Sequence, residues 1–234
     1  MAKIRTYFIY GILCYVLQSC AVADTSKYQL SSGVYNSKLF KHTAKVYVDV
    51  AEDSITVYPI VKNNHSNLAD TTQSVSYPTN YSSFQNRYFS KPSFDIDILT
   101  MPLKYRPALN GSPNQLNTDF NGALYLGWRN DIYHIKYRKT LFGTYKRKVS
   151  HYGFSTGAFC GIGATAINPW VTNNNVAAEY DGAVLLTGVA AIFAVNNLSC
   201  GVGVGIDKLM DSNSGFWMYQ NKPWVGLLFG LNLN

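Results

Sequence analysis

Charged residues are scarce in this chain. They make up 14% of its 234 residues, whereas an ordinary soluble domain has about 25%. Hydrophobic residues make up 47% and aromatic residues 15%, so the chain can bury a sizeable core but has few charges for a water-exposed surface. Part of its surface is therefore expected to face something other than water. The length suits one domain, or one domain with an appendage.

Several sequence motifs are absent, and each absence removes a class of protein. Four cysteines without a C-x-x-C pair exclude a zinc ribbon and a thioredoxin-like site. There is no phosphate-binding loop, haem motif or basic-aromatic motif of a nucleic-acid-binding module. No later segment reaches 18 consecutive apolar residues, so no transmembrane helix is expected. We therefore expect no cofactor, no metal and no nucleic-acid partner.

The N-terminus has the pattern of an export signal. Lys3 and Arg5 precede an apolar run of about a dozen residues, which is the length of a signal-peptide core and too short to span a bilayer. Two signal-peptide cleavage sites are compatible with this sequence. Residues 17–20, Leu-Gln-Ser-Cys, are similar to a bacterial lipobox, with a signal peptide at 1–19 and lipidation of Cys20. The alternative is an A-x-A site that ends at Ala23.

Strict two-residue alternation runs through the second half of the chain, and it predicts strands. Between Leu198 and Ile206 the even positions are apolar, whereas the odd positions are serine and glycine. Residues 153–166 and 224–233 have the same pattern. A soluble sandwich would instead place charged residues on its outer face. A membrane barrel explains both faces: the apolar face meets lipid, and glycines inside a narrow barrel leave room for larger side chains.

The expected organisation is a signal peptide at 1–19, an N-terminal extension at 20–93 and a barrel at 94–234. The extension is irregular at first, forms a hairpin at 45–61 and ends in a polar linker at 62–93. The fold class is an all-β, antiparallel transmembrane β-barrel of eight strands. The count of eight requires the 45–61 hairpin in the barrel; the alternative leaves it outside and splits residues 119–138 into two strands.

The chain resembles the small outer-membrane β-barrel proteins of Gram-negative bacteria, in the style of barrels from Bacteroidota. The resemblance rests on the Leu-Gln-Ser-Cys signal, the glycine-rich strands, the stretch DIDILTMPLKYRP and the ending KPWVGLLFGLNLN. It implies an outer-membrane location and a non-enzymatic role: structural, as an accessory subunit of a larger outer-membrane complex, or in surface interactions. An exported soluble β-sandwich lipoprotein is the alternative without a membrane span.

Ionisable residues suggest two features of such a barrel. Asp95 and Asp97 share a strand face. Inside a barrel they would form ion pairs with cations, for which the candidates are Lys104, Arg106 and Arg129; the alternative is that they line a pore. The one basic cluster would contact lipopolysaccharide phosphates or anionic lipid headgroups, unless it is only a solvated loop. Its members are Lys136, Arg138, Lys139, Lys146, Arg147 and Lys148.

Catalytic groups are sparse. Some outer-membrane barrels are lipid hydrolases, so His151 with Ser155 or Ser150 is the candidate pair for a lipid-modifying enzyme. Residues 151 and 155 on one strand are roughly 13 Å apart, which is too far for a nucleophile–base hydrogen bond. No catalytic residue is therefore assigned. Residues 207–215 are interpreted as a turn. Cys160 and Cys200 are interpreted as small apolar strand residues, with a disulfide between them as the alternative that an exported chain permits. Ten aromatic residues near strand ends suggest interfacial girdles: Tyr105, Trp128, Tyr133, Tyr137, Tyr152, Trp170, Tyr180, Trp217, Tyr219 and Trp224.

Overall fold

The computed structural model describes residues 29–40, 42–63, 66–81, 86–109, 111, 113–196 and 198–232. The expected signal peptide, Cys20 and the alternative cleavage site at Ala23 lie outside the described residues. Within them, the protein is all-β and antiparallel, and its helices are three short 3-10 turns, η1 (Thr71–Gln73), η2 (Trp170–Thr172) and η3 (Ser212–Gly215).

The described part of the chain forms thirteen strands. In chain order they are β1 (Gly33–Phe40), β2 (His42–Val50), β3 (Ser54–Asn63), β4 (Ser66–Ala69), β5 (Val75–Pro78), β6 (Asn80–Tyr81), β7 (Arg87–Arg106), β8 (Gln115–Asn117), β9 (Asn121–Lys139), β10 (Tyr145–Ile167), β11 (Tyr180–Val195), β12 (Leu198–Leu209) and β13 (Pro223–Asn232).

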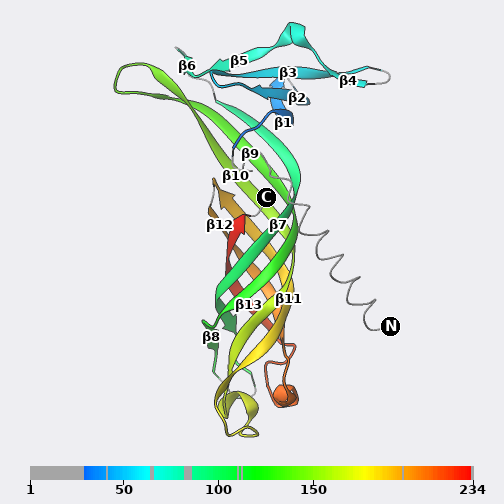
Figure 1. The fold of residues 1–234 in the computed structure, drawn as a ribbon, viewed down its shortest axis with the longest axis vertical. Coiled ribbons are helices and arrows are strands. Elements are labelled where there is room, and N and C mark those ends of the chain that lie inside the picture. The colour runs from blue at the N-terminus through cyan, green and yellow to red at the C-terminus, as the bar shows by residue number, and fades with distance from the viewer. Residues whose placement is uncertain are drawn as a thin grey trace, which may run out of the picture.

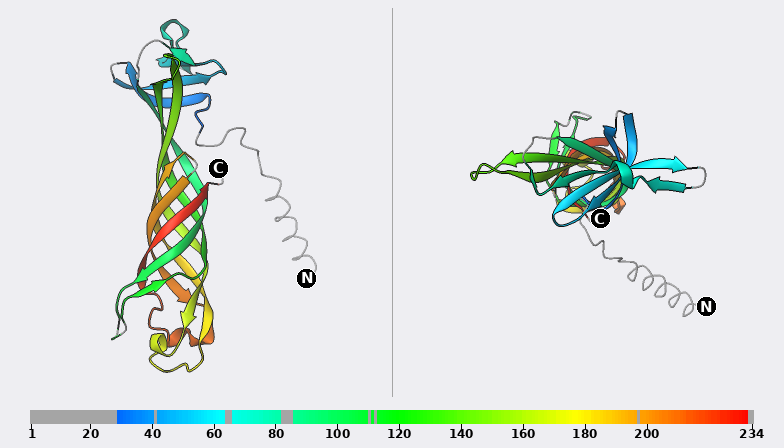
Figure 2. Two further views of the ribbon diagram at one scale, coloured as in Figure 1. Left: turned by 90° about the vertical axis from the view of Figure 1, so that its left-hand side faces the viewer. Right: turned by 90° about the horizontal axis from the view of Figure 1, so that it is seen from above.

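Six of these strands pair in a closed ring, which we call the ring. Strands β7, β9, β10, β11, β12 and β13 pair in that order, and β13 pairs back with β7. At this closing seam Val225 pairs with Tyr105 and Leu231 with Ile98. Figures 1 and 2 show the six strands twisting around a common axis. Every neighbouring pair is antiparallel.

A branch of the same sheet, which we call the N-terminal sheet, extends from one end of the ring. There β7, β9 and β10 extend beyond the other three strands, and β1 pairs with β7 through Asn36 and Ser90. From β1 the sheet continues through β2 and β3 to β4, and it lies across the end of the extended strands (Figure 1). Its core includes Tyr35, Val46 and Val57 of the sheet with Phe89 and Ile135 of the extension. The sheet is therefore packed onto the strands that leave the ring.

The strand count and the borders of the first half differ from the sequence-based expectation. The 45–61 hairpin exists as β2 and β3, but these strands pair in the N-terminal sheet, so they add nothing to the ring. Residues 119–138 do not split, because β9 is continuous there. The ring thus has six strands and not eight. Where a polar linker was expected at 62–93, the structure has β4, β5, β6 and the start of β7, because backbone pairing with β3, β9 and β10 orders this polar segment.

The predicted strand faces are confirmed. Along β12 the apolar residues at even positions are exposed, whereas the odd positions point into the ring. The glycines there lie against large side chains of neighbouring strands. A Cβ at Gly203 would be 2.8 Å from Leu228 Cδ1 and 3.3 Å from Phe159 Cε1, and one at Gly205 would be 2.6 Å from Trp224 Cζ2. The glycine face therefore makes room for the side chains that fill the ring.

A bulge in β7 reverses which face its residues present. Leu99 and Met101 are buried at odd positions, but beyond Pro102 the buried residues are Lys104 and Arg106, at even positions. The register of β7 against β13 shifts at the same place. An extra residue at a bulge exchanges the two faces of the strand that follows, and proline is tolerated at such sites. The bulge thus brings both basic residues inside the ring.

The close approach at Gly205 generates a prediction. The Gly205→Leu change forces a branched side chain against Trp224 and the Thr187 carbonyl, which lies 2.7 Å from the position of a Cβ. Overpacking of this kind typically costs about 1–3 kcal/mol, and we expect at least that loss in the free energy of unfolding. The measurement is a guanidinium titration followed by tryptophan fluorescence. The control is Val204→Leu on the outer face of the same strand; equal stability of the two variants would contradict the packing argument.

Candidate functional site

One group of buried ionisable residues, the Asp131 cluster, lies inside the ring near the N-terminal sheet. It consists of Asp95, Arg129, Asp131 and His151. The Arg129 guanidinium lies 2.8 Å from Asp131 and 3.3 Å from Asp95. Nε2 of His151 is 2.7 Å from Asp131 Oδ1, and the Ser93 hydroxyl donates to the other oxygen of Asp131 at 3.0 Å. The Asp131 carboxylate thus accepts bonds from three strands, β7, β9 and β10.

The second group, the Asp207 cluster, lies toward the opposite end of the ring. The Lys104 ammonium is 2.9 Å from the Asp207 carboxylate, and the Arg106 guanidinium pairs with the same carboxylate. The indole of Trp224 donates to Asp207 at 2.8 Å, and Arg106 also donates to Thr165 at 2.9 Å. All five side chains are buried. One carboxylate therefore compensates two buried cations.

The structure brings the predicted interior residues together in a different way than expected. Asp95, Asp97, Lys104, Arg106 and Arg129 are all buried, and Arg129 pairs with Asp95. The other two cations, however, pair with Asp207 and not with Asp95 or Asp97. Asp207 was missed because residues 207–215 were interpreted as a turn, whereas β12 continues to Leu209. The sequence did contain a signal for Asp207: it occupies an odd position, as the inward-facing glycines of the same strand do.

Apolar side chains fill the ring between the two clusters. The buried set is Leu99, Met101, Ala123, Tyr125, Phe159, Leu186, Ala190, Ile192, Trp224 and Leu228. The Phe159 and Trp224 rings are 5.9 Å apart between centroids. The interior is thus a packed core with an ionic layer on either side, and it resembles the interior of a soluble protein more than a water-filled channel.

The candidate hydrolase residues have other partners. Nδ1 of His151 is 3.4 Å from the Asn196 carbonyl, while its Nε2 contacts Asp131. The Ser155 hydroxyl is 2.8 Å from the Tyr125 hydroxyl. His151 and Ser155 are both buried inside the ring. His151 and Asp131 therefore connect β9 and β10 to the β11–β12 turn.

The outer surface of the ring is apolar. Its exposed side chains include Ile98, Leu126, Trp128, Phe154, Ile162, Val189, Phe193, Val202, Val204, Val225, Leu227 and Phe229. Cys160 and Cys200 are exposed on the same surface, and both are unpaired, a point that the sequence left open. Contiguous apolar surface of this extent marks contact with a membrane or with another protein.

The predicted aromatic girdle is only partly present. Trp128, Trp170 and Tyr105 are exposed, but five of the ten aromatic residues are buried, because their positions fall on the inward face or in the packed loops: Tyr133, Tyr137, Trp217, Tyr219 and Trp224. The Arg106 guanidinium lies over the Trp217 ring at 5.2 Å from its centroid. These buried aromatics therefore serve the core and cation–π contacts.

Four of the six residues of the predicted basic cluster form one face of the β9–β10 extension. Lys136 pairs across the strands with Lys148, and Arg138 with Lys146. These four side chains, which we call the basic face, point away from the N-terminal sheet. Arg147 is on the other face and donates to the Tyr77 carbonyl, so it does not belong to the same surface. Lys139 is exposed next to the hairpin tip.

Like charges directly opposite each other destabilise a strand pair, so the basic face suits an anionic partner. His134 lies beside it on the same strand face and stacks on Tyr88 at 4.2 Å between ring centroids. Burial, and secondly the charge of Lys136, hold the pKa of His134 below its ordinary value. His134 is therefore expected to be neutral near pH 7, which leaves the charge of this surface to the lysines and arginine.

Comparison with known proteins adds no identification: no family model, curated protein or solved structure matches the chain. Within the described ranges, no helix is long and apolar enough to cross a membrane. In the same part of the chain, no group of three or more histidine, cysteine or acidic side chains is arranged to hold a metal.

The Asp207 cluster generates a prediction about stability. Asp207→Asn preserves the shape of the side chain but leaves the buried Lys104 and Arg106 without their carboxylate. Removing one partner of a buried ion pair costs about 3–5 kcal/mol, and we expect a loss of that order in a guanidinium titration. The control is Glu179→Gln, which removes the same charge from an exposed loop position and should change stability by less than about 0.5 kcal/mol. A variant as stable as wild type would mean that water or another group compensates the cations.

Proposed function

We propose that the ring is a membrane-spanning β-barrel of an outer membrane, and that it anchors the N-terminal sheet at the membrane surface in a non-enzymatic role. The proposal rests on the distribution of polar and apolar side chains, which is the reverse of that in a water-soluble protein. Carboxylates, lysine, arginine and histidine are buried inside the ring, whereas leucine, valine, isoleucine, phenylalanine and tryptophan are exposed outside it. In water this arrangement would be unfavourable, because apolar area is stabilised by removal from water. In lipid it is the expected one.

Strand lengths support the same conclusion. A tilted transmembrane β-strand needs about 9–11 residues, and the six strands have between 10 and 23. Pairing around the ring satisfies backbone groups that lipid cannot. Single-chain bacterial barrels generally have eight or more strands, so a six-stranded barrel would be narrower. The glycine-rich inward face and the packed interior fit that smaller diameter.

A packed interior supports an anchor rather than a channel. The apolar layer and the two ion clusters leave the ring filled by side chains, as in other small barrels. The parts that remain for interaction are the N-terminal sheet, the basic face and the loops. The role that fits best is therefore structural, as an accessory subunit of a larger outer-membrane complex, or as a surface for partners.

Loop lengths indicate an orientation. The connections at one end of the ring span residues 107–120, 168–179 and 210–222, whereas those at the other end span 140–144 and 196–197. Bacterial barrels have short periplasmic turns and longer extracellular loops. The N-terminal sheet and the basic face would then be periplasmic, next to inner-leaflet phospholipid, and lipopolysaccharide would meet the longer loops. Lipidation of Cys20, which rests on the sequence pattern alone, would tether the same side.

Two exposed tryptophans provide a test. Trp128 is 70% exposed on the apolar surface of β9, and Trp170 is 77% exposed in the 168–179 loop. In vesicles of lipid brominated near the headgroup end of the acyl chains, we expect quenching of wild type and of Trp170→Phe, and loss of most quenching in Trp128→Phe. Water-soluble acrylamide should show the opposite pattern, because Trp170 stays in water.

The same samples distinguish the alternatives. Extraction with carbonate should leave the protein in the membrane pellet, and the unboiled protein should migrate anomalously on a gel. If acrylamide quenches Trp128 strongly, brominated lipid does not, and carbonate releases the protein, the ring is a soluble or peripheral β-structure and the proposal fails.

A further inference from the structure

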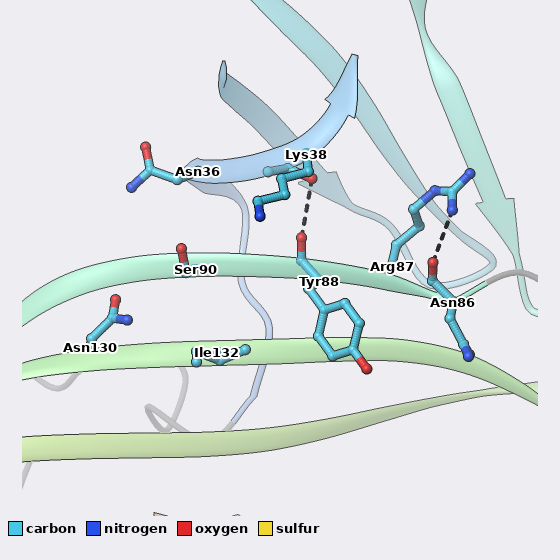
Figure 3. Close-up of a pocket in the computed structure, with 9 residues that line it drawn as sticks. Asn36, Lys38, Asn86, Arg87, Tyr88, Ser90, Asn130 and Ile132 are labelled. Carbon is cyan, nitrogen blue, oxygen red and sulfur yellow. Dashed lines mark hydrogen bonds between the residues drawn. The ribbon is translucent and has the colours of Figure 1, made fainter. Parts of the chain in front are cut away.

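A cavity of about 460 Å³ lies where the N-terminal sheet meets the ring strands, and its lining combines apolar surface with several polar groups. β1 contributes Asn36 and Lys38, and the chain leading into β7 contributes Asn86. Figure 3 shows Lys38 extending from β1 toward β7, with Ser90 and Asn130 on the strands below it. Its volume is within the range of small-molecule sites, which is roughly 300–1,000 Å³.

The lining has the chemistry of an anion site. It offers the Lys38 ammonium, the amides of Asn36, Asn86 and Asn130, and the hydroxyl of Ser90, and none of the described residues that line it is acidic. Arg87 also lines the cavity, but its guanidinium donates to the Asn86 carbonyl at 3.0 Å. Lysine binds phosphate as a point charge, and amide and hydroxyl donors add directional bonds. The bond to a neutral carbonyl leaves the charge of Arg87 in place, so the lining carries two positive charges and suits an anionic ligand.

The cavity is built by backbone pairing. Asn36 of β1 pairs with Ser90 of β7, and the Ser37 hydroxyl donates to the Tyr88 carbonyl at 3.1 Å (Figure 3). Tyr88 is in turn fixed by its stacking on His134. The donors are thus held on three paired strands, β1, β7 and β9.

The position of the cavity relative to the apolar surface identifies the ligand. On the outer face of β7 and β9 the paired residues are Phe94 with Trp128, then Pro92 with Asn130, then Ser90 with Ile132. The cavity therefore begins two residues beyond the Phe94–Trp128 aromatic pair, about 7 Å along the strand. The headgroup layer of a bilayer is about 5–8 Å thick on each side. A lipid against the ring would have its headgroup at the level of the cavity and its acyl chains on the apolar surface.

We propose that this cavity binds the phosphodiester headgroup of an anionic phospholipid, with Lys38 contacting the phosphate and Ser90 and Asn130 donating hydrogen bonds. The inference rests on the proposed function, because it needs the ring in a bilayer. A bound lipid would bridge β1 and the ring, so it would also fix the N-terminal sheet at the membrane surface.

The test uses the full chain purified in a non-ionic detergent, with native mass spectrometry to count bound phosphatidylglycerol during a titration. We expect saturable binding to wild type, and binding weakened at least about tenfold in Lys38→Met, which loses a charge-assisted contact. Asn130→Leu should weaken binding without a change of charge. The matched control is Lys148→Met, which removes the same charge from the basic face and should bind as wild type does. Phosphatidylcholine, whose headgroup carries an added positive charge, should bind less tightly.

The following results would contradict the proposed lipid site. Equal binding by Lys38→Met and wild type, or equal loss in Lys148→Met, would show that the cavity is not the site. Displacement of the lipid by soluble glycerol phosphate at similar concentration would assign the site to a soluble phosphate ester. Quenching of Trp128 by brominated lipid, measured on the same preparations, separates the two proposals: quenching without Lys38-dependent binding refutes only the lipid site, whereas absence of quenching in wild type refutes both.

Discussion

The narrow interior of the ring is the constraint on which the rest of the structure depends. Six strands enclose less space than eight, so large inward side chains need neighbouring positions that carry no side chain, which means glycine. Phe159 lies against both Gly188 and Gly203, and Trp224 lies against Gly205. Glycine normally weakens a strand, but here its lack of a side chain permits closure around a packed core. The alternation of glycine and apolar residues is thus the sequence pattern that a narrow, closed six-stranded ring requires.

The bulge at Pro102 determines where the charges lie. Without it, Lys104 and Arg106 would share a face with Ile96 and Ile98, on the apolar exterior. The reversal of faces moves both cations inside, where Asp207 compensates them. The apolar exterior therefore depends on one irregularity in β7 as much as on the regular alternation of the other strands. The proposed insertion into lipid requires an exterior free of these cations.

Sequence reasoning predicted the faces of individual strands well, because side-chain direction in a strand is a local property with a period of two. It predicted the faces of β10, β12 and β13 and the inward direction of Asp95. It could not predict strand partners: hairpin 45–61 has the same local pattern whether it pairs with β1 or inside a barrel. The partnership of Lys104 with Asp207, 103 residues away in sequence, depends on the register of β7, and no local pattern reveals the bulge.

The long strands β7, β9 and β10 run through both halves of the molecule and connect them. The environment of each strand face changes along their length. The inward face of β9 continues from Tyr125 in the ring, through the buried Arg129 and Asp131, to Ile135 against the N-terminal sheet. The Asp131 cluster therefore lies between the two apolar cores. The outward face of β9 changes from Leu126 and Trp128, through Asn130, Ile132 and His134, to the basic face. In the membrane orientation proposed above, the apolar end of this face would lie in the acyl chains and the basic end outside them. The same strand would then both support the N-terminal sheet and fix its height relative to the membrane.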